Sequence, residues 1–111
     1  MASGDRVEAR LCAPTQLGTS TTTLFTVASG HTYVAKQIII TNTDTVDRTV
    51  TLAIGSAATA SNRIMSALPI GANDMMVFDT ALVLLTTETL QGLSDTASKV
   101  NVTCIGWDKT N

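Results

Sequence analysis

Few side chains in this sequence could do chemistry, and they stand far apart along the chain. His31 is the one histidine, so a Ser-His-Asp or Cys-His site would have to use it. It stands just before an apolar run, and the nucleophile motif G-x-S-x-G occurs nowhere in the sequence. We therefore expect His31 to be a surface residue at the start of a strand, and we expect the protein not to be an enzyme.

The carboxylates and thiols do not indicate a metal or cofactor site. Asp44 and Asp47 lie close together, but they belong to "NTDTVD", where Asp side chains cap a turn. Cys12 and Cys104 are far apart, with no C-x-x-C motif and no His or Cys at metal-ligand spacing. The sequence predicts no metal ion and no cofactor. It leaves open whether the two cysteines are free or form a bridge between the first and last strands.

The composition favours contact with other proteins. The chain has 111 residues, enough for one domain with a modest core. Only 14% of its residues are charged and 4% are aromatic, while 44% are hydrophobic. Because a lone soluble domain usually has a surface that is about 25–35% charged, this surface is suited to being covered by partners.

Neither nucleic acid nor a membrane is indicated as a partner. The formal net charge is −2, and the basic residues are scattered singly along the sequence rather than clustered as phosphate contacts require. No run approaches the roughly 20 apolar residues of a membrane span. The start of the chain lacks the basic and apolar regions of a secretory signal, so we do not expect Sec export. The basic residues are Arg6, Arg10, Lys36, Arg48, Arg63, Lys99 and Lys109.

The apolar pattern predicts an all-β protein. In "RTVTLAI", residues 48–54, apolar and polar side chains alternate strictly, which is typical of a half-buried strand. Together with residues 32–41 and the turn "NTDTVD" it forms a predicted hairpin. Further strands are expected near 22–27, 63–67, 75–79 and 99–107, with apolar runs at 82–85 and 89–93.

Seven or eight short strands with turns between them predict a single antiparallel β-sandwich, jelly-roll or immunoglobulin-like, or a small barrel. We expect residues 1–19 to be an N-terminal arm with one short strand at 7–13. Residues 20–107 are expected to form the sandwich, and 108–111 a C-terminal tail.

Some side chains of these strands are expected to face outward. Tyr33 and Trp107 could share an outward face on different strands, either as a second core layer or as an interface anchor. Lys36 interrupts an otherwise apolar strand. Met75 and Met76 are adjacent and should point to opposite faces, one into the core and one toward a partner.

The succession of motifs resembles a family of small structural proteins of tailed bacteriophage virions. The segments that resemble it are "LFTVASGH", "IIITNTD", "LPIGAND", "TETLQGL" and "VNVTCIG", and the resemblance spans residues 24–107. The chain has "ASG" where a proline is usual and "TETL" where Gly-Asp is usual. The resemblance implies a β-sandwich accessory subunit present in many copies on a phage particle.

A capsid decoration or cement protein fits this resemblance best. Its partners would be the major capsid protein or other virion proteins, and it would form a homo-oligomer, with a trimer favoured by the threefold positions of capsids. Its place would be the virion, with assembly in the host cytoplasm. Alternatives are a neck, tail or fibre subunit, and a small carbohydrate-binding module for adsorption.

The residues predicted to make protein contacts come from the arm and from the outward positions. If the arm mediates assembly, removing residues 1–15 should leave the sandwich folded and weaken assembly. The predicted contact residues are Val7, Arg10, Leu11, Tyr33, Met75, Met76 and Trp107.

Overall fold

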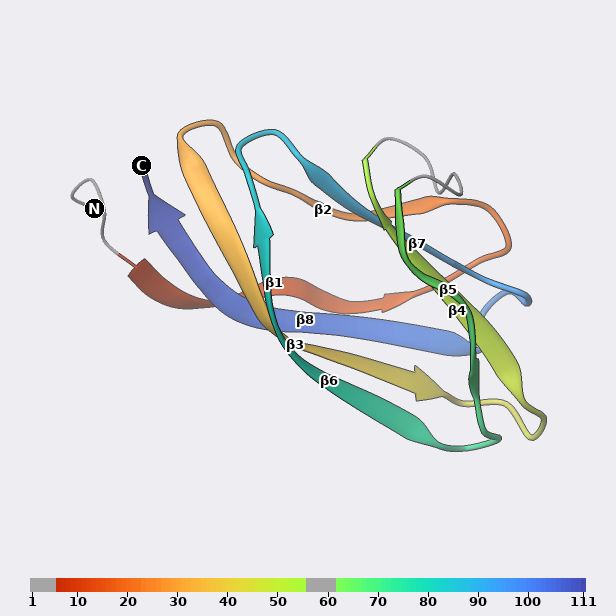
Figure 1. Cartoon of the computed structure of the whole chain (residues 1–111). Coiled ribbons are helices and arrows are strands. Elements are labelled where there is room, and N and C mark those ends of the chain that lie inside the picture. The colour runs from red at the N-terminus through yellow and green to blue at the C-terminus, as the bar shows by residue number, and fades with distance from the viewer. Residues whose placement is uncertain (1–5, 56–61) are drawn as a thin grey trace.

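The computed structural model describes residues 6–55 and 62–111 of the chain. Across these residues it has eight β-strands and no helix (Figure 1). The prediction of an all-β protein is therefore confirmed. The strands are β1 (Arg6–Gln16), β2 (Thr22–Thr26), β3 (His31–Asn42), β4 (Arg48–Ile54), β5 (Arg63–Ile70), β6 (Met75–Leu84), β7 (Thr89–Ser94) and β8 (Val100–Thr110).

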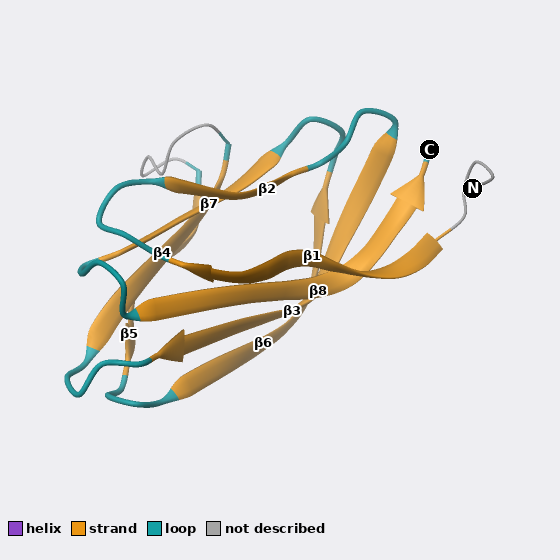
Figure 2. Ribbon diagram, turned by 180° about the vertical axis from the view of Figure 1, so that it is seen from behind, coloured by secondary structure: helices purple, strands orange, loops and turns teal. Residues whose placement is uncertain are grey.

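The strands form two four-stranded antiparallel sheets that face each other (Figure 2). The first sheet has the order β1-β8-β3-β6, and the second has the order β2-β7-β4-β5. An eight-stranded sandwich in which the first and last strands lie side by side, with crossovers between the sheets, is a jelly roll. The sequence pattern fitted both a jelly roll and an immunoglobulin-like sandwich. The strand order shows that the fold is a jelly roll.

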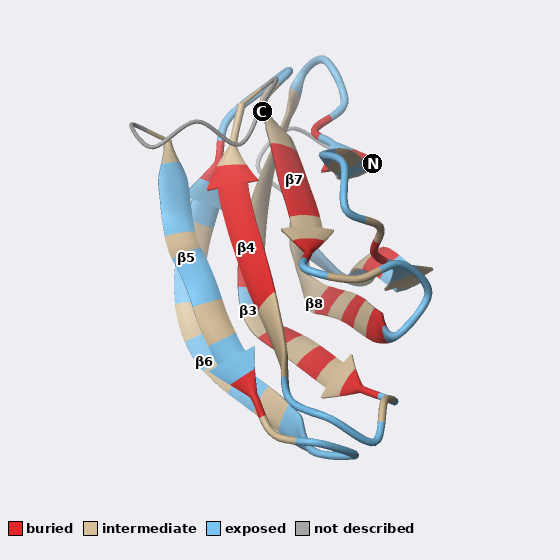
Figure 3. Cartoon of the chain, turned by 90° about the vertical axis from the view of Figure 1, so that its right-hand side faces the viewer, coloured by how far each residue is buried: buried red, intermediate tan, exposed pale blue. Residues whose placement is uncertain are grey.

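The core lies between the sheets. It consists of the side chains that point inward from both sheets, in most strands every second residue. Val50 and Leu52 on β4 and Val100 and Val102 on β8 are completely buried. Burying each such side chain contributes about 1.5–3 kcal/mol. The inner strands β4 and β7 are buried over most of their length, whereas the edge strands β5 and β6 are largely exposed (Figure 3).

Several strands are longer than their sequence patterns indicated. β1 runs from Arg6 to Gln16 and pairs with β8 along most of its length, so these residues are an edge strand of the first sheet and not an arm. β8 continues to Thr110, which places most of the expected C-terminal tail in the sheet. The runs expected at 75–79 and 82–85 belong to one strand, β6. Sheet pairing extends these strands through residues whose own patterns are weak.

A β-bulge at Lys36 changes which side chains of β3 face the core. Ala35 pairs with Gly106 and Gln37 pairs with Ile105, so Lys36 is an extra residue on β3. The alternation restarts there, which places Tyr33 on the same side as Ile38. The sequence alternation had put Tyr33 and Ile38 on opposite faces, and that prediction is wrong.

Gly106 lets the backbones approach each other at this bulge. A Cβ atom on Gly106 would overlap the carbonyl oxygen of Val34 and would lie 2.9 Å from the nitrogen of Lys36. Residue 106 therefore has to be glycine for β3 and β8 to pair across the bulge.

Candidate interaction surface

Three of the predicted contact residues pack against the core instead of facing outward. Tyr33 lies beside Phe25 with their ring centroids 5.9 Å apart, and it packs against the buried cluster. Leu11 and Met76 are partly buried against the same cluster. Tyr33 therefore does not share an outward face with Trp107, and the pair is neither a second core layer nor a joint anchor.

Trp107 lies between two cations on the outer face of the first sheet, the face turned away from the second sheet. The centroid of its ring is 5.4 Å from Cζ of Arg6 and 5.3 Å from Nζ of Lys36. Such contacts contribute about 0.5–1 kcal/mol each at an exposed site. The bulge residue Lys36, which interrupts the apolar strand in the sequence, is thus placed over the indole ring.

A shallow hollow of about 420 Å³ opens beside Trp107. Ile105 and the indole supply its apolar part, and Arg10 and Lys36 supply positive charge. The structure thus brings the predicted contact residues Arg10 and Trp107 together. Its remaining lining residues are Glu8, Ala9, Gln37 and Gly106.

Four of the seven basic residues lie on the same half of this outer face, and we call them the basic face: Arg6, Arg10, Lys36 and Lys109. Arg6 is directly opposite Lys109, which shares the face of Trp107 by strand alternation. Like charges in that position repel each other. Glu8 pairs with Trp107, and among the paired residues of β1 and β8 it is the one acidic side chain on the outer face. No local sequence signal shows the cluster, because its members come from three strands.

The outer side chains of β6 form a second exposed surface. Met75 is 53% exposed, and Val77 and Val83 are similarly open. Leu85, which follows β6, is 58% exposed. We call these four residues the β6 stripe. Adjacent Met75 and Met76 point to opposite faces, as predicted, with Met75 outward and Met76 against the core.

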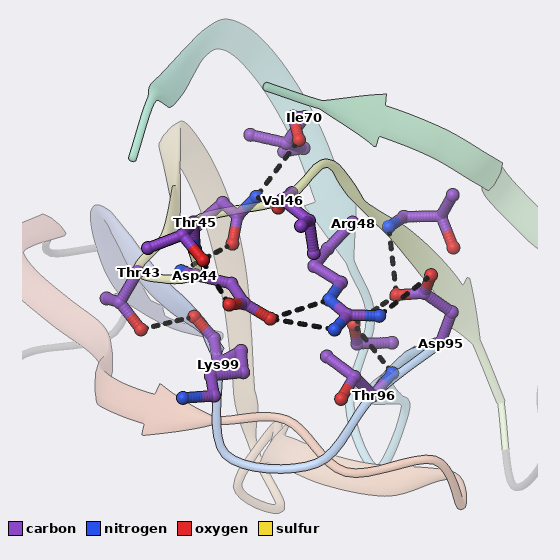
Figure 4. A network of polar contacts seen from close by, with 12 residues as sticks. Thr43, Asp44, Thr45, Val46, Arg48, Ile70, Asp95, Thr96 and Lys99 are labelled. Atoms are coloured by element: carbon purple, nitrogen blue, oxygen red, sulfur yellow. Dashed lines mark hydrogen bonds and ion pairs between the residues drawn. The ribbon is translucent and has the colours of Figure 1, made fainter. Parts of the chain in front are cut away.

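A polar network joins the β3–β4, β5–β6 and β7–β8 loops at one end of the sandwich (Figure 4). The buried side chain of Asn42 donates to the carbonyl oxygens of Val46, Ile70 and Gly71, and it accepts from the nitrogen of Asp44. The side chain of Arg48 donates to Asp44 at 2.8 Å. This hydrogen bond holds the pKa of Asp44 below its usual value. As predicted, Asp44 is a turn residue.

His31 begins β3, as expected, and its Nδ1 lies 2.6 Å from Oδ1 of Asp108. Both side chains are about a quarter exposed. The contact joins the start of β3 to the last part of β8, beside Tyr33.

The two cysteines face each other inside the first sheet. Cys12 and Cys104 are paired in the register of β1 and β8, and both are buried and unbridged. The neighbouring Cys12 thiol and burial raise the pKa of the Cys104 thiol above its usual range. Both act as small core residues in this state.

Neither a metal cluster nor a membrane helix is found in the described ranges. Within residues 6–55 and 62–111 no three His, Cys, Asp or Glu side chains come together as metal ligands would. The same ranges contain no helix long and apolar enough to cross a membrane. Two outer surfaces of the described residues present groups to a partner: the basic face with its hollow, and the β6 stripe.

Comparison with known proteins shows similarity at the level of the fold. No protein-family model matches the chain, and no curated protein matches it in sequence. A solved structure from the work entitled "Bacillus endospore appendages form a novel family of disulfide-linked pili" aligns with a TM-score of 0.55 at 14% identity, covering 98% of this chain and 91% of that chain. A chain of infectious bursal disease virus, Gx strain, aligns with a TM-score of 0.49 at 13% identity, over 96% of this chain and 32% of that chain.

Proposed function

We propose that this protein is a non-enzymatic structural subunit that assembles through its outer surfaces, and that it decorates the capsid of a tailed bacteriophage. The observation that supports assembly is the β6 stripe. It places exposed apolar side chains along an edge strand, on both sides of the exposed Asp79, and exposed apolar patches mark interaction surfaces in soluble proteins. The phage location rests on the sequence resemblance over residues 24–107.

The fold comparison supports a repeating subunit in general terms. The fold seen in the Bacillus appendage structure builds pili there, linked by disulfides. In this chain the two cysteines are buried opposite each other, so neither is positioned for a bond to another copy. Non-covalent contacts would therefore join its copies.

The neck, tail and fibre locations differ from decoration in copy number. A decoration protein needs a copy number comparable with that of the major capsid protein, whereas a neck ring or tail tip needs few copies. A carbohydrate-binding module fits less well, because Arg6 and Lys36 already occupy positions over the ring of Trp107.

The β6 stripe can be tested with the double variant Val77→Lys/Val83→Lys. Both side chains are exposed, so the variant should fold with a stability within about 0.5 kcal/mol of the parent. We expect it to lose self-association in sedimentation velocity and incorporation into purified particles. Ile64→Lys, at an exposed apolar position on β5 of the second sheet, is the matched control.

Quantifying this chain against the major capsid protein in those particles tests the location. Comparable copy numbers support decoration, and a few copies per particle would move the protein to the neck or tail. A parent chain that stays monomeric and never joins a particle would refute the structural role itself.

A further inference from the structure

The hollow beside Trp107 has the chemistry of a socket for an apolar side chain flanked by carboxylates. Its apolar part comes from Ile105 and the indole, and two cations, Arg10 and Lys36, line it beside one carboxylate, Glu8. Arg6 and Lys109 extend the positive charge along the same face, where they oppose each other across β1 and β8. An anionic partner would relieve this repulsion, so the face favours an acidic group.

One end of the same molecule presents such a group, while the hollow lies near the middle of the first sheet. The β3–β4, β5–β6 and β7–β8 loops gather at that end, far from the end of β8 (Figure 1). Backbone hydrogen bonds join them: the nitrogen of Asn73 donates to Asp44, and the nitrogen of Thr43 donates to Lys99. Four of the nine acidic residues lie on these loops, against one basic residue, Lys99, with Arg48 adjoining them at the start of β4. The acidic four are Asp44, Asp47, Asp74 and Asp95.

The tip of the β3–β4 loop carries an exposed apolar side chain, Val46, which we call the plug. Val46 is 50% exposed and stands between Asp44 and Asp47 in the sequence. Its carbonyl oxygen accepts a hydrogen bond from the buried amide of Asn42, which fixes the backbone while half of the side chain stays exposed. An apolar knob on a rigid, acidic loop matches an apolar hollow with cationic margins.

We propose that the β3–β4 loop of one copy inserts Val46 into the hollow beside Trp107 of a second copy. The Asp47 carboxylate then lies against Arg10 and Lys36, while Asp44 stays paired with Arg48 of its own copy. The occupant is a second copy because this chain itself carries, on its loops, the negative charge and the exposed apolar side chain that the hollow would accept. The inference rests on the proposed function as a self-assembling subunit, and it names the contact.

This contact joins two different surfaces of the chain. Each copy in a pair therefore keeps one surface free, and a further copy can add in the same way. Such a heterologous interface closes into a ring where the rotation between copies allows it and otherwise gives a filament. A cyclic trimer, which the threefold positions of capsids favour for a decoration protein, uses contacts of this kind. The molecule measures 47 × 25 × 19 Å. The hollow lies along the middle of β1, β3 and β8, and the plug lies beyond the end of β3.

A charge exchange between the two surfaces tests the contact. Lys36→Glu places a carboxylate at the hollow, and Val46→Lys places an ammonium group on the plug. Each single variant should weaken self-association of the full chain about tenfold in sedimentation velocity, because like charges then meet. The double variant Val46→Lys/Lys36→Glu should restore the association. High salt, about 1 M, where the screening length is about 3 Å, should weaken the parent and the double variant alike.

Three outcomes decide between this contact and the alternatives. If both single variants associate like the parent, or the double variant does not recover, the contact is refuted while the structural role stands. If the parent never associates at any concentration, the proposed function fails with it. Salt-sensitive binding of a fluorescent single-stranded oligonucleotide that Lys36→Glu abolishes, without any self-association, would assign the basic face to nucleic acid instead. Arg63→Glu, at an exposed cation on β5, is the matched control for a general charge effect.

Discussion

At the scale of single residues, Asn42 is the side chain on which the loop end depends. It is 1% exposed and donates to three carbonyl oxygens of two loops. Asn42→Ala would leave these acceptors and the nitrogen of Asp44 without their partner, and we expect the free energy of unfolding to fall by about 2–3 kcal/mol. Urea denaturation followed by tryptophan fluorescence measures it, since Trp107 is the one tryptophan.

Asn101→Ala, at a partly exposed position on the outer face of β8, is the control and should change stability by about 0.5 kcal/mol or less. Equal losses in the two variants would show that the amide network does not stabilise the loops.

Some side-chain positions could be predicted from the sequence. The turn role of Asp44 and the opposite faces of Met75 and Met76 follow from local rules, and the structure agrees with them. The role of Tyr33 could not be predicted, because the extra residue at Lys36 reverses the alternation that precedes it. A bulge depends on the partner strand, which a single strand pattern does not reveal.

At the scale of elements, the pairing of β3 with β8 depends on the missing side chain at Gly106. Gly106→Ala would push a methyl group into the carbonyl oxygen of Val34, and we expect a loss of about 3 kcal/mol through strain at the bulge. Thermal unfolding by circular dichroism measures this loss. Gly18→Ala is the matched control, because a Cβ atom there has no neighbour within 4 Å. If Gly106→Ala unfolds at the same temperature as Gly18→Ala, the close approach does not limit the sheet.

Elements with strict alternation were predictable and those shaped by their neighbours were less so. β4 matches its predicted bounds, Arg48–Ile54, because the alternation in its sequence continues through the whole strand. It is not half-buried as predicted, since all four residues 50–53 are buried. β6 was predicted as two runs, since Asp79 and Thr80 break its apolar pattern, yet pairing with β3 continues past them. The basic face was missed for a related reason: its members share a sheet face but no stretch of sequence.

At the scale of the whole molecule, the chain is closed by pairing its first strand with its last. Arg6 pairs with Lys109 and Gln16 with Asn101, so β1 reaches across almost the entire sequence to cover the edge of β8. Cys12 on β1 is part of the core. The hypothesis of a removable arm is therefore replaced by that of a strand on which the first sheet depends.

Deleting residues 1–15 should consequently unfold the protein instead of only weakening its assembly. The deletion removes the partner of β8, the inward Cys12 and nearly all of one edge strand, which exposes backbone groups and apolar surface together. We expect loss of the cooperative thermal transition and association into irregular aggregates, measured by circular dichroism and light scattering. Deleting residues 1–5, which precede β1, is the control and should preserve the transition. A 1–15 deletion that melts cooperatively within a few degrees of the parent would restore the arm hypothesis, because the sandwich would then fold without its first strand.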